Sequence, residues 1–308
     1  WIPGGSGTFQ RAMLFSGAGN ITVASNIVPS TPSRMSLDKS GTGTLTLSGA
    51  NTFSGGTTID EGKITATTST ALGAGAVVNH GTLELTAGAV TYTGLSSSLS
   101  GRGSINVTLG SGTATTLLNG NYSGFSGTWN IGIGAASGAG KVQMNGLDHP
   151  SATIRVLENA TLYTTSGTHQ ADLVLYGGNT GESLGQLRIE GSASWAGDIT
   201  LAGPITGTGD GHIGANSGTG TISGNIGETG GAHGLVKDGD GTIVLTGINT
   251  HTGTTAVNDG VLLVESPGSL AGAVTVASGA TFGGSGTVGG GITVDAGGTL
   301  DPGRTGPV

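Results

Sequence analysis

Apolar and polar residues alternate along the chain in short runs that are bounded by Gly or Asn. Clear examples are GTLTLSG (43–49), GTLELTAG (81–88), GQLRIEG (185–191) and GTIVLTG (241–247). Such short alternation is typical of β-strands with one buried face. No segment of ten or more residues shows the apolar 3.6-residue period of a helix. The pattern therefore predicts an all-β protein.

The strands recur at a spacing that favours a solenoid. We expect one inward-pointing apolar residue per coil at Leu45, Ile64, Leu83, Ile105, Trp129, Ile154, Leu175, Ile199, Ile222, Ile243 and Leu262. The steps between them are 19 to 25 residues, with a mean near 22. A β-sandwich would show turns every ~8–12 residues, and parallel strands without helical crossovers require a coiled backbone. We therefore predict a β-solenoid with coils of roughly 20–25 residues, which stack at ~4.8 Å per coil.

One long repeat supports this reading. LDKSGTGTLTLSGANTFSGGTTIDEGKIT (37–65) aligns without gaps to LVKDGDGTIVLTGINTHTGTTAVNDGVLL (235–263), with 12 of 29 positions identical. The offset is 198 residues, which we interpret as nine coils of 22. We expect inward-pointing residues at Leu45, Leu47, Ile243 and Leu245, and corners at Gly49, Asn51, Gly247 and Asn249.

These two segments resemble the passenger-associated, or autotransporter-associated, β-strand repeat. GATFGGSGTVGGGITVDAGGTLDPG (279–303) is similar to a motif that often follows it. Together the resemblance covers residues 37–65 and 235–303. It implies a right-handed parallel β-helix, export from a Gram-negative-type cell, and display or release outside that cell.

Composition narrows the range of partners. The 308 residues include 65 Gly, no Cys, and a formal charge of −8. Without a cluster of Lys or Arg, the sequence predicts no nucleic-acid partner, and without Cys it excludes disulfides. No apolar run approaches the ~20 residues of a membrane-spanning segment. Because the repeat pattern reaches both ends, we expect residues 1–308 to be a single elongated fragment of a longer secreted chain.

Candidate chemistry is sparse. Asp210, Asp238 and Asp240 lie in Gly-rich loops, where we interpret them as caps of exposed turns rather than calcium ligands. His212 and His233 lie about one coil apart, which would bring them near Asp210, although exposed loop histidines are the simpler interpretation.

Charged and aromatic residues are two further groups with possible chemistry. Ionisable residues are modestly enriched in 148–190, which we interpret as surface decoration: Arg155, Glu158, Asp172, Glu182, Arg188 and Glu190. Tyr122, Phe125 and Trp129 could form a carbohydrate platform, but we expect aromatic residues to lie inside the solenoid. We therefore predict no catalytic, metal-binding or cofactor-binding residues.

The expected function is that of a non-catalytic extracellular or cell-surface scaffold, stalk or adhesin-like module. Two alternatives remain open: a self-assembling filament or surface-layer subunit, and a polysaccharide-binding or polysaccharide-active β-helix. The expected partners are other copies of the chain or adjacent coils of the parent protein, and surface glycans. The apolar segment 1–17 is expected to pack across the first coil or against a neighbouring molecule.

Overall fold

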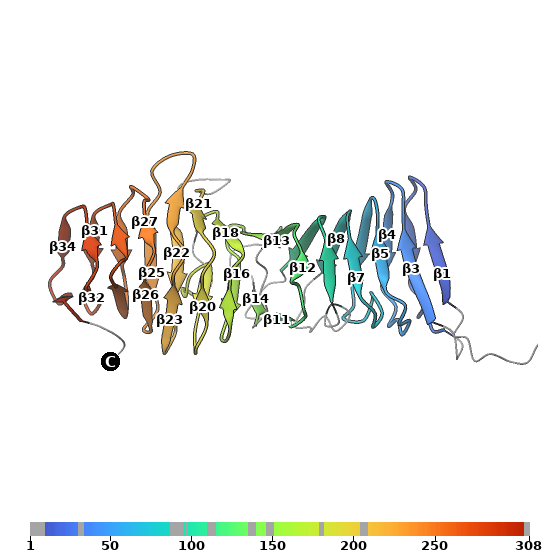
Figure 1. The fold of residues 1–308 in the computed structure, drawn as a ribbon, viewed down its shortest axis with the longest axis horizontal. Coiled ribbons are helices and arrows are strands. Elements are labelled where there is room, and N and C mark those ends of the chain that lie inside the picture. Colours follow the sequence, from blue (N-terminus) through green and yellow to red (C-terminus); the bar gives the residue numbers. More distant parts are fainter. Residues whose placement is uncertain are drawn as a thin grey trace, which may run out of the picture.

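The computed structural model describes residues 10–29, 34–86, 95, 98–109, 115–134, 140–145, 151–178, 182–203 and 209–304. Parallel strands stack into an elongated solenoid of about 12 turns with ~22 residues per turn (Figure 1). The predicted fold class and coil length are thereby confirmed. The part of the chain that the structure describes has no helix long and apolar enough to cross a membrane.

Two sheets begin at the N-terminal end of the rod. The six-stranded sheet contains β1 (Gln10–Phe15), β3 (Arg34–Lys39), β5 (Thr57–Ile59), β7 (Val77–Asn79), β9 (Leu99–Gly101) and β12 (Gly124–Phe125). The ten-stranded sheet contains β2 (Ile21–Val23), β4 (Thr44–Leu47), β6 (Lys63–Ala66), β8 (Thr82–Thr86), β10 (Ser104–Thr108), β13 (Thr128–Ile133), β15 (Thr153–Val156), β18 (Asp172–Leu175), β21 (Ile199–Leu201) and β24 (Ile226–Glu228).

Three further sheets complete the rod. The nine-stranded sheet contains β11 (Thr115–Leu118), β14 (Lys141–Met144), β16 (Thr161–Thr164), β19 (Leu187–Ile189), β22 (Gly211–Gly214), β25 (Leu235–Asp238), β28 (Thr255–Val257), β31 (Val274–Val276) and β34 (Ile292–Val294). The seven-stranded sheet contains β17 (Thr168–His169), β20 (Ser194–Trp195), β23 (Thr219–Ile222), β26 (Thr242–Leu245), β29 (Val261–Val264), β32 (Thr281–Gly284) and β35 (Thr299–Pro302). The three-stranded sheet contains β27 (Ile248–Asn249), β30 (Ser269–Leu270) and β33 (Thr287–Val288).

The two sequence repeats occupy different faces of the solenoid. The consecutive strands β11, β12 and β13 lie in the nine-, six- and ten-stranded sheets, so one coil presents three faces. In the first repeat β3 and β4 belong to the six- and ten-stranded sheets. Their counterparts β25 and β26 belong to the nine- and seven-stranded sheets. The interpretation of the 198-residue offset as nine whole coils is therefore wrong, because the intervening coils differ in length.

Apolar residues form the continuous inner row of the ten-stranded sheet. In register these are Ile21, Leu45, Ile64, Leu83, Ile105, Trp129, Ile154, Leu173, Ile199 and Ile226. The expected series follows this row as far as Ile154, but then takes Leu175 in place of Leu173. From Ile222 onward it runs along the seven-stranded sheet instead. The sequence spacing predicts the wrong residue after Ile199, because the coil from Ile199 to Ile226 spans 27 residues.

Successive coils approach so closely at one corner that only glycine fits. This corner precedes the ten-stranded sheet and, farther along, the three-stranded sheet. A Cβ atom on Gly127 would overlap the carbonyl oxygen of Gly103, and one on Gly247 would overlap that of Gly224. Close backbone approach therefore accounts for part of the high glycine content.

The shared positions of the repeats behave largely as expected. Leu47 and Leu245 are fully buried. Asn51 accepts a hydrogen bond from the backbone N–H of Ile27 and donates to the carbonyl of Ala71, so it joins three successive coils. Asn249, which aligns with Asn51 in the second repeat, forms the same two kinds of hydrogen bond. The Asn249 side chain accepts from the N–H of Ile226 and donates to the carbonyl of Ser269.

The apolar N-terminal segment contributes the first rung of the stack. Residues 10–15 form β1, which pairs in parallel with β3 along its whole length. Met13 and Phe15 pack against the core, whereas Leu14 is exposed. This segment continues the solenoid instead of crossing its end. Residues 1–9 of the expected cap lie outside the described residues.

Candidate functional site

Charged side chains form a network on the nine-stranded sheet. Arg188 donates from Nε to Glu190 at 2.7 Å and from Nη1 to Glu182 at 2.8 Å. The Nζ of Lys141 donates to the second oxygen of Glu182 at 2.6 Å. The hydroxyl of Tyr163 donates to Glu190 at 3.1 Å, and its ring centre lies 4.6 Å from the Arg188 guanidinium. The network pairs two cations with two carboxylates.

Three of the six ionisable residues singled out in 148–190 belong to this network, namely Glu182, Arg188 and Glu190. Arg155 and Asp172 lie instead on β15 and β18 of the ten-stranded sheet. The interpretation as surface decoration is wrong for Arg188 and Glu190, which are each 9% exposed. Burial opposes ionisation of Glu190, but hydrogen bonds from Arg188 and the Asn216 backbone hold its pKa below the ordinary value. A carboxyl held ionised is unsuited to general-acid work.

Asp238 differs from its expected role. It is 4% exposed on β25, where one carboxylate oxygen lies 2.6 Å from Nδ1 of His212. The other oxygen accepts a hydrogen bond from Asn258 at 3.2 Å. The prediction that Asp238 caps an exposed turn is therefore wrong. Asp240, two residues on, does lie in an exposed turn.

The structure does not assemble the group of His212, His233 and Asp210 that the one-coil spacing suggested as an alternative. Asp210 accepts a hydrogen bond from the backbone N–H of Gly234 at 2.8 Å. The Nε2 of His233 lies 3.0 Å from the carbonyl of Thr229, while His212 pairs with Asp238. Among the described residues no three His, Asp or Glu side chains come together in a way that could hold a metal ion.

The aromatic residues considered as a carbohydrate platform lie inside the solenoid. Tyr122, Phe125 and Trp129 are at most 1% exposed. The ring centres of Tyr122 and Trp129 are 5.4 Å apart, and those of Phe125 and Trp129 are 5.8 Å apart. These rings fill the core, as the burial preference of aromatic residues predicts.

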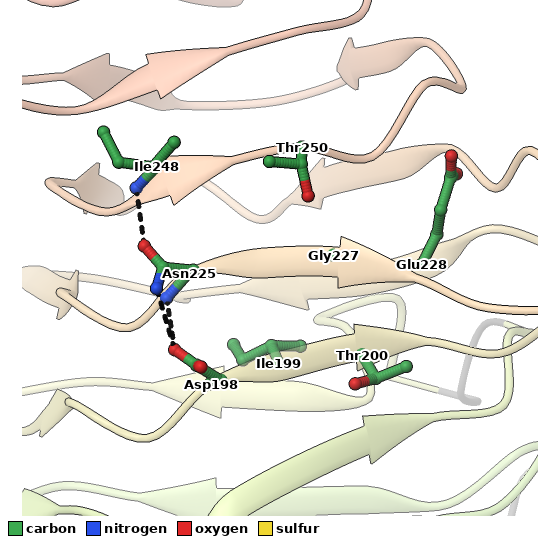
Figure 2. A pocket seen from close by; sticks show the side chains of 8 residues that line it. All are labelled: Asp198, Ile199, Thr200, Asn225, Gly227, Glu228, Ile248 and Thr250. Carbon is green, nitrogen blue, oxygen red and sulfur yellow. Dashed lines mark hydrogen bonds between the residues drawn. The ribbon is translucent and has the colours of Figure 1, made fainter.

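A shallow groove of about 440 Å³ crosses the outer face of the solenoid at β21, β24 and the strand β27 that stacks on them. Gly227 lies at its centre, between the side chains of Thr200 and Thr250 (Figure 2). Asp198 and Glu228 border it on opposite sides of Gly227 (Figure 2). No Lys or Arg lines this groove, which we call the Gly227 groove.

One wall of the Gly227 groove is a fixed ladder of polar groups. Asp198 Oδ1 accepts hydrogen bonds from the backbone N–H of Asn225 at 2.9 Å and from its side-chain amide at 3.2 Å. The amide oxygen of Asn225 then accepts from the N–H of Ile248 at 2.8 Å (Figure 2). The side chain of Ile248 is 50% exposed and supplies an apolar surface.

Glu228 on the opposite side is also held in place. One of its oxygens accepts from the N–H and the hydroxyl of Thr252, and the other accepts from the N–H of His233. Burial opposes its ionisation, but the hydrogen bonds from Thr252 and His233 hold the pKa of Glu228 below its ordinary value. Glu228 is therefore held in place and is not poised as a general acid.

Sequence reasoning missed this groove. Its one visible trace is the segment NIGE (225–228), which places Gly227 where the preceding strand segment DITL (198–201) has Thr200. A single glycine among 65 carries little signal by itself. The stacking of β24 on β21 is needed to show that it interrupts a row of side chains.

Comparison with known proteins identifies the repeat and a relative of the chain. The passenger-associated-transport-repeat family matches residues 37–66 and 235–264. The chain is also similar to the adhesin BmaC autotransporter of Brucella suis biovar 1 (strain 1330). The two are 32% identical over 273 aligned residues, which cover 83% of this chain and 8% of that protein. No solved structure matches the chain.

The chain thus spans less than a tenth of the curated relative that it matches. The family match falls on the two segments that carry the sequence repeat, and the wider similarity extends over the stacked coils between them. The chain thus carries two passenger-associated transport repeats and resembles an autotransporter over most of its length.

Proposed function

We propose that this chain is a non-catalytic, adhesin-like segment of a secreted autotransporter passenger, which acts at the cell surface as an extended scaffold with binding surfaces on its sides. The observation that carries the proposal is the similarity of most of the chain to an autotransporter that is named as an adhesin. The elongated stack of parallel coils supports it, since a rod can hold a lateral surface away from its attachment point.

The lowered pKa values of Glu190 and Glu228 disfavour use of either residue as the general acid of a glycosidase. Retaining and inverting glycosidases rely on a carboxylic acid that is kept protonated beside a second carboxylate. Glu190 and Glu228 instead have pKa values below the ordinary value, because hydrogen-bond donors surround them. The polysaccharide-active alternative therefore has less support than a binding role.

Adhesion can be tested with the purified chain coupled to fluorescent beads. Beads that carry the folded chain should remain on an epithelial cell monolayer after washing in at least threefold excess over albumin-coated beads. Beads that carry the heat-unfolded chain provide a control for nonspecific attachment. Retention equal to that of the albumin beads would overturn the proposed adhesive function.

A further inference from the structure

The outer face of the ten-stranded sheet carries one continuous row of side chains that ends in a gap. In register this row consists of Thr22, Thr46, Thr65, Glu84, Asn106, Asn130, Arg155, Val174, Thr200 and Gly227. Nine strands place a side chain at this position, and only β24 has none. The Gly227 groove lies at this gap.

Neither backbone conformation nor packing requires glycine at 227. Its φ angle is not in the left-handed region, and an added Cβ atom would meet only the hydroxyl of Thr250, at an ordinary 3.6 Å. Gly224, three residues earlier, contrasts with it, because a Cβ there would overlap the carbonyl oxygen of Gly197. Glycine inside a strand generally weakens it and often marks a place where a ligand approaches the backbone closely.

The walls of the groove provide hydrogen-bonding groups and an apolar surface. Asp198 engages Asn225 through Oδ1, and among the described residues its Oδ2 forms no hydrogen bond. The hydroxyls of Thr200 and Thr250 flank the bare backbone of Gly227 (Figure 2). Ile248 adds a half-exposed aliphatic side chain. Such a set suits a ligand with vicinal hydroxyl groups on one side and a C–H face on the other.

Charge and backbone pairing select among ligand classes. Carboxylates without a neighbouring Lys or Arg repel phosphates, sulfates and sugar acids. A peptide strand cannot add here by backbone pairing, because β24 is hydrogen-bonded to β21 on one side and contacted by Thr250 and Ile248 of the next coil on the other. A bound metal ion would need several converging ligands, and the described residues form no such group.

We propose that the Gly227 groove binds a neutral sugar residue of a surface glycan. The C–H face of the pyranose lies on the backbone of Gly227 and on Ile248, and two adjacent hydroxyl groups donate to Asp198. Thr200 and Thr250 hydrogen-bond to the remaining hydroxyls. This inference rests on the proposed adhesive function and names the chemistry of one contact that would serve it.

The test measures binding of the purified chain to maltohexaose, cellohexaose and N-acetylchitohexaose, with a hyaluronan hexasaccharide and a hexalysine peptide as charged probes. We expect binding to at least one neutral oligosaccharide. Gly227→Val, which fills the floor with a residue that favours strands, and Asp198→Asn should each raise its Kd at least tenfold. Gly291→Val is the matched control, since that glycine is also unhindered and lies far along the rod. It should leave the Kd unchanged.

The proposal is overturned if no neutral oligosaccharide binds, if only hyaluronan or hexalysine binds, or if Gly227→Val and Gly291→Val behave alike. Melting curves of all variants check that each chain is folded. The bead assay separates the two levels of inference. Beads that adhere although no neutral glycan binds would leave the adhesive function standing without this groove, whereas wild-type beads that do not adhere would remove the adhesive function itself.

Discussion

Lys39 and Lys237 place their ammonium groups in equivalent carbonyl cages, although the two residues lie on different faces of the solenoid. Lys237 Nζ donates to the carbonyls of Asp238, Gly239 and Asp259. Lys39 Nζ donates to those of Ser40, Gly41 and Glu61. In each case two carbonyls belong to the following corner and the third to the next coil. Each copy of the repeat thus contains a lysine whose side chain links two successive coils.

Replacing Lys237 with Met should destabilise the chain by about 2–3 kcal/mol at pH 7, because three carbonyls lose a charged donor. Burial lowers the pKa of Lys237 to about 8, so its side chain is still mainly an ammonium at that pH. Urea unfolding monitored by circular dichroism measures the change. The control is Lys63→Met, which removes a half-exposed pair with Glu84 and should cost no more than about 1 kcal/mol. Equal losses for the two variants would contradict the linking role.

His251 should make the chain sensitive to acid. It is fully buried with Nε2 2.9 Å from the hydroxyl of Thr255. Burial lowers the pKa of His251, against smaller opposing effects of the Ile226 backbone and Glu228. The unfolded chain therefore takes up a proton below pH ~6.5 before the folded chain does. Stability should fall with decreasing pH by at most ~1.4 kcal/mol per pH unit from this group.

The first repeat supplies the control for this effect. Phe53 occupies the position that corresponds to His251 and is also fully buried. His251→Phe should therefore fold and should show a smaller loss of melting temperature between pH 7.5 and pH 5 than the wild type. An unchanged pH dependence in His251→Phe would exclude His251 as the responsible group.

Asp238 and Asp240 should respond differently to removal of their carboxylates. Asp238→Ala leaves His212 and Asn258 without their buried partner and should cost about 1–3 kcal/mol. Asp240→Ala alters an exposed turn and should change stability by no more than ~0.5 kcal/mol. Thermal melts before and after dialysis against a chelator complete the test. A large loss for Asp240→Ala, or a chelator-dependent melt, would indicate a bound cation at the turn.

Gly224 and Gly227 allow the two uses of glycine to be separated. Gly224→Ala should destabilise the fold by on the order of 3 kcal/mol, because the new Cβ overlaps the carbonyl of Gly197 in the preceding coil. Gly227→Ala should be neutral or slightly stabilising, since its Cβ meets only Thr250 at van der Waals distance. Denaturant midpoints of the two variants decide the matter. Similar destabilisation by both would show that Gly227 also has a packing role.

Local patterns were sufficient to predict the class of fold. Short alternation determines which residues of a strand face the core, because side chains point to opposite faces with a period of two. Sequence spacing alone predicts that Leu45, Ile64 and Leu83 lie in one inner row, and the register confirms this. The burial preference of aromatic residues likewise placed Trp129 inside the core. Each of these inferences depends on a residue and its near neighbours.

Contacts between coils were decided only by the tertiary structure. The face occupied by the second repeat depends on the summed lengths of all intervening coils. A coil of 27 residues, where the mean is ~22, therefore shifts every later segment relative to the faces that the mean spacing predicts. The pairing of Asp238 with His212 and the gap at Gly227 likewise arise between residues that stacking brings together. The sequence determines which side chains of a strand point outward and which point inward. The residue that each side chain contacts in the next coil depends on the register between the two coils.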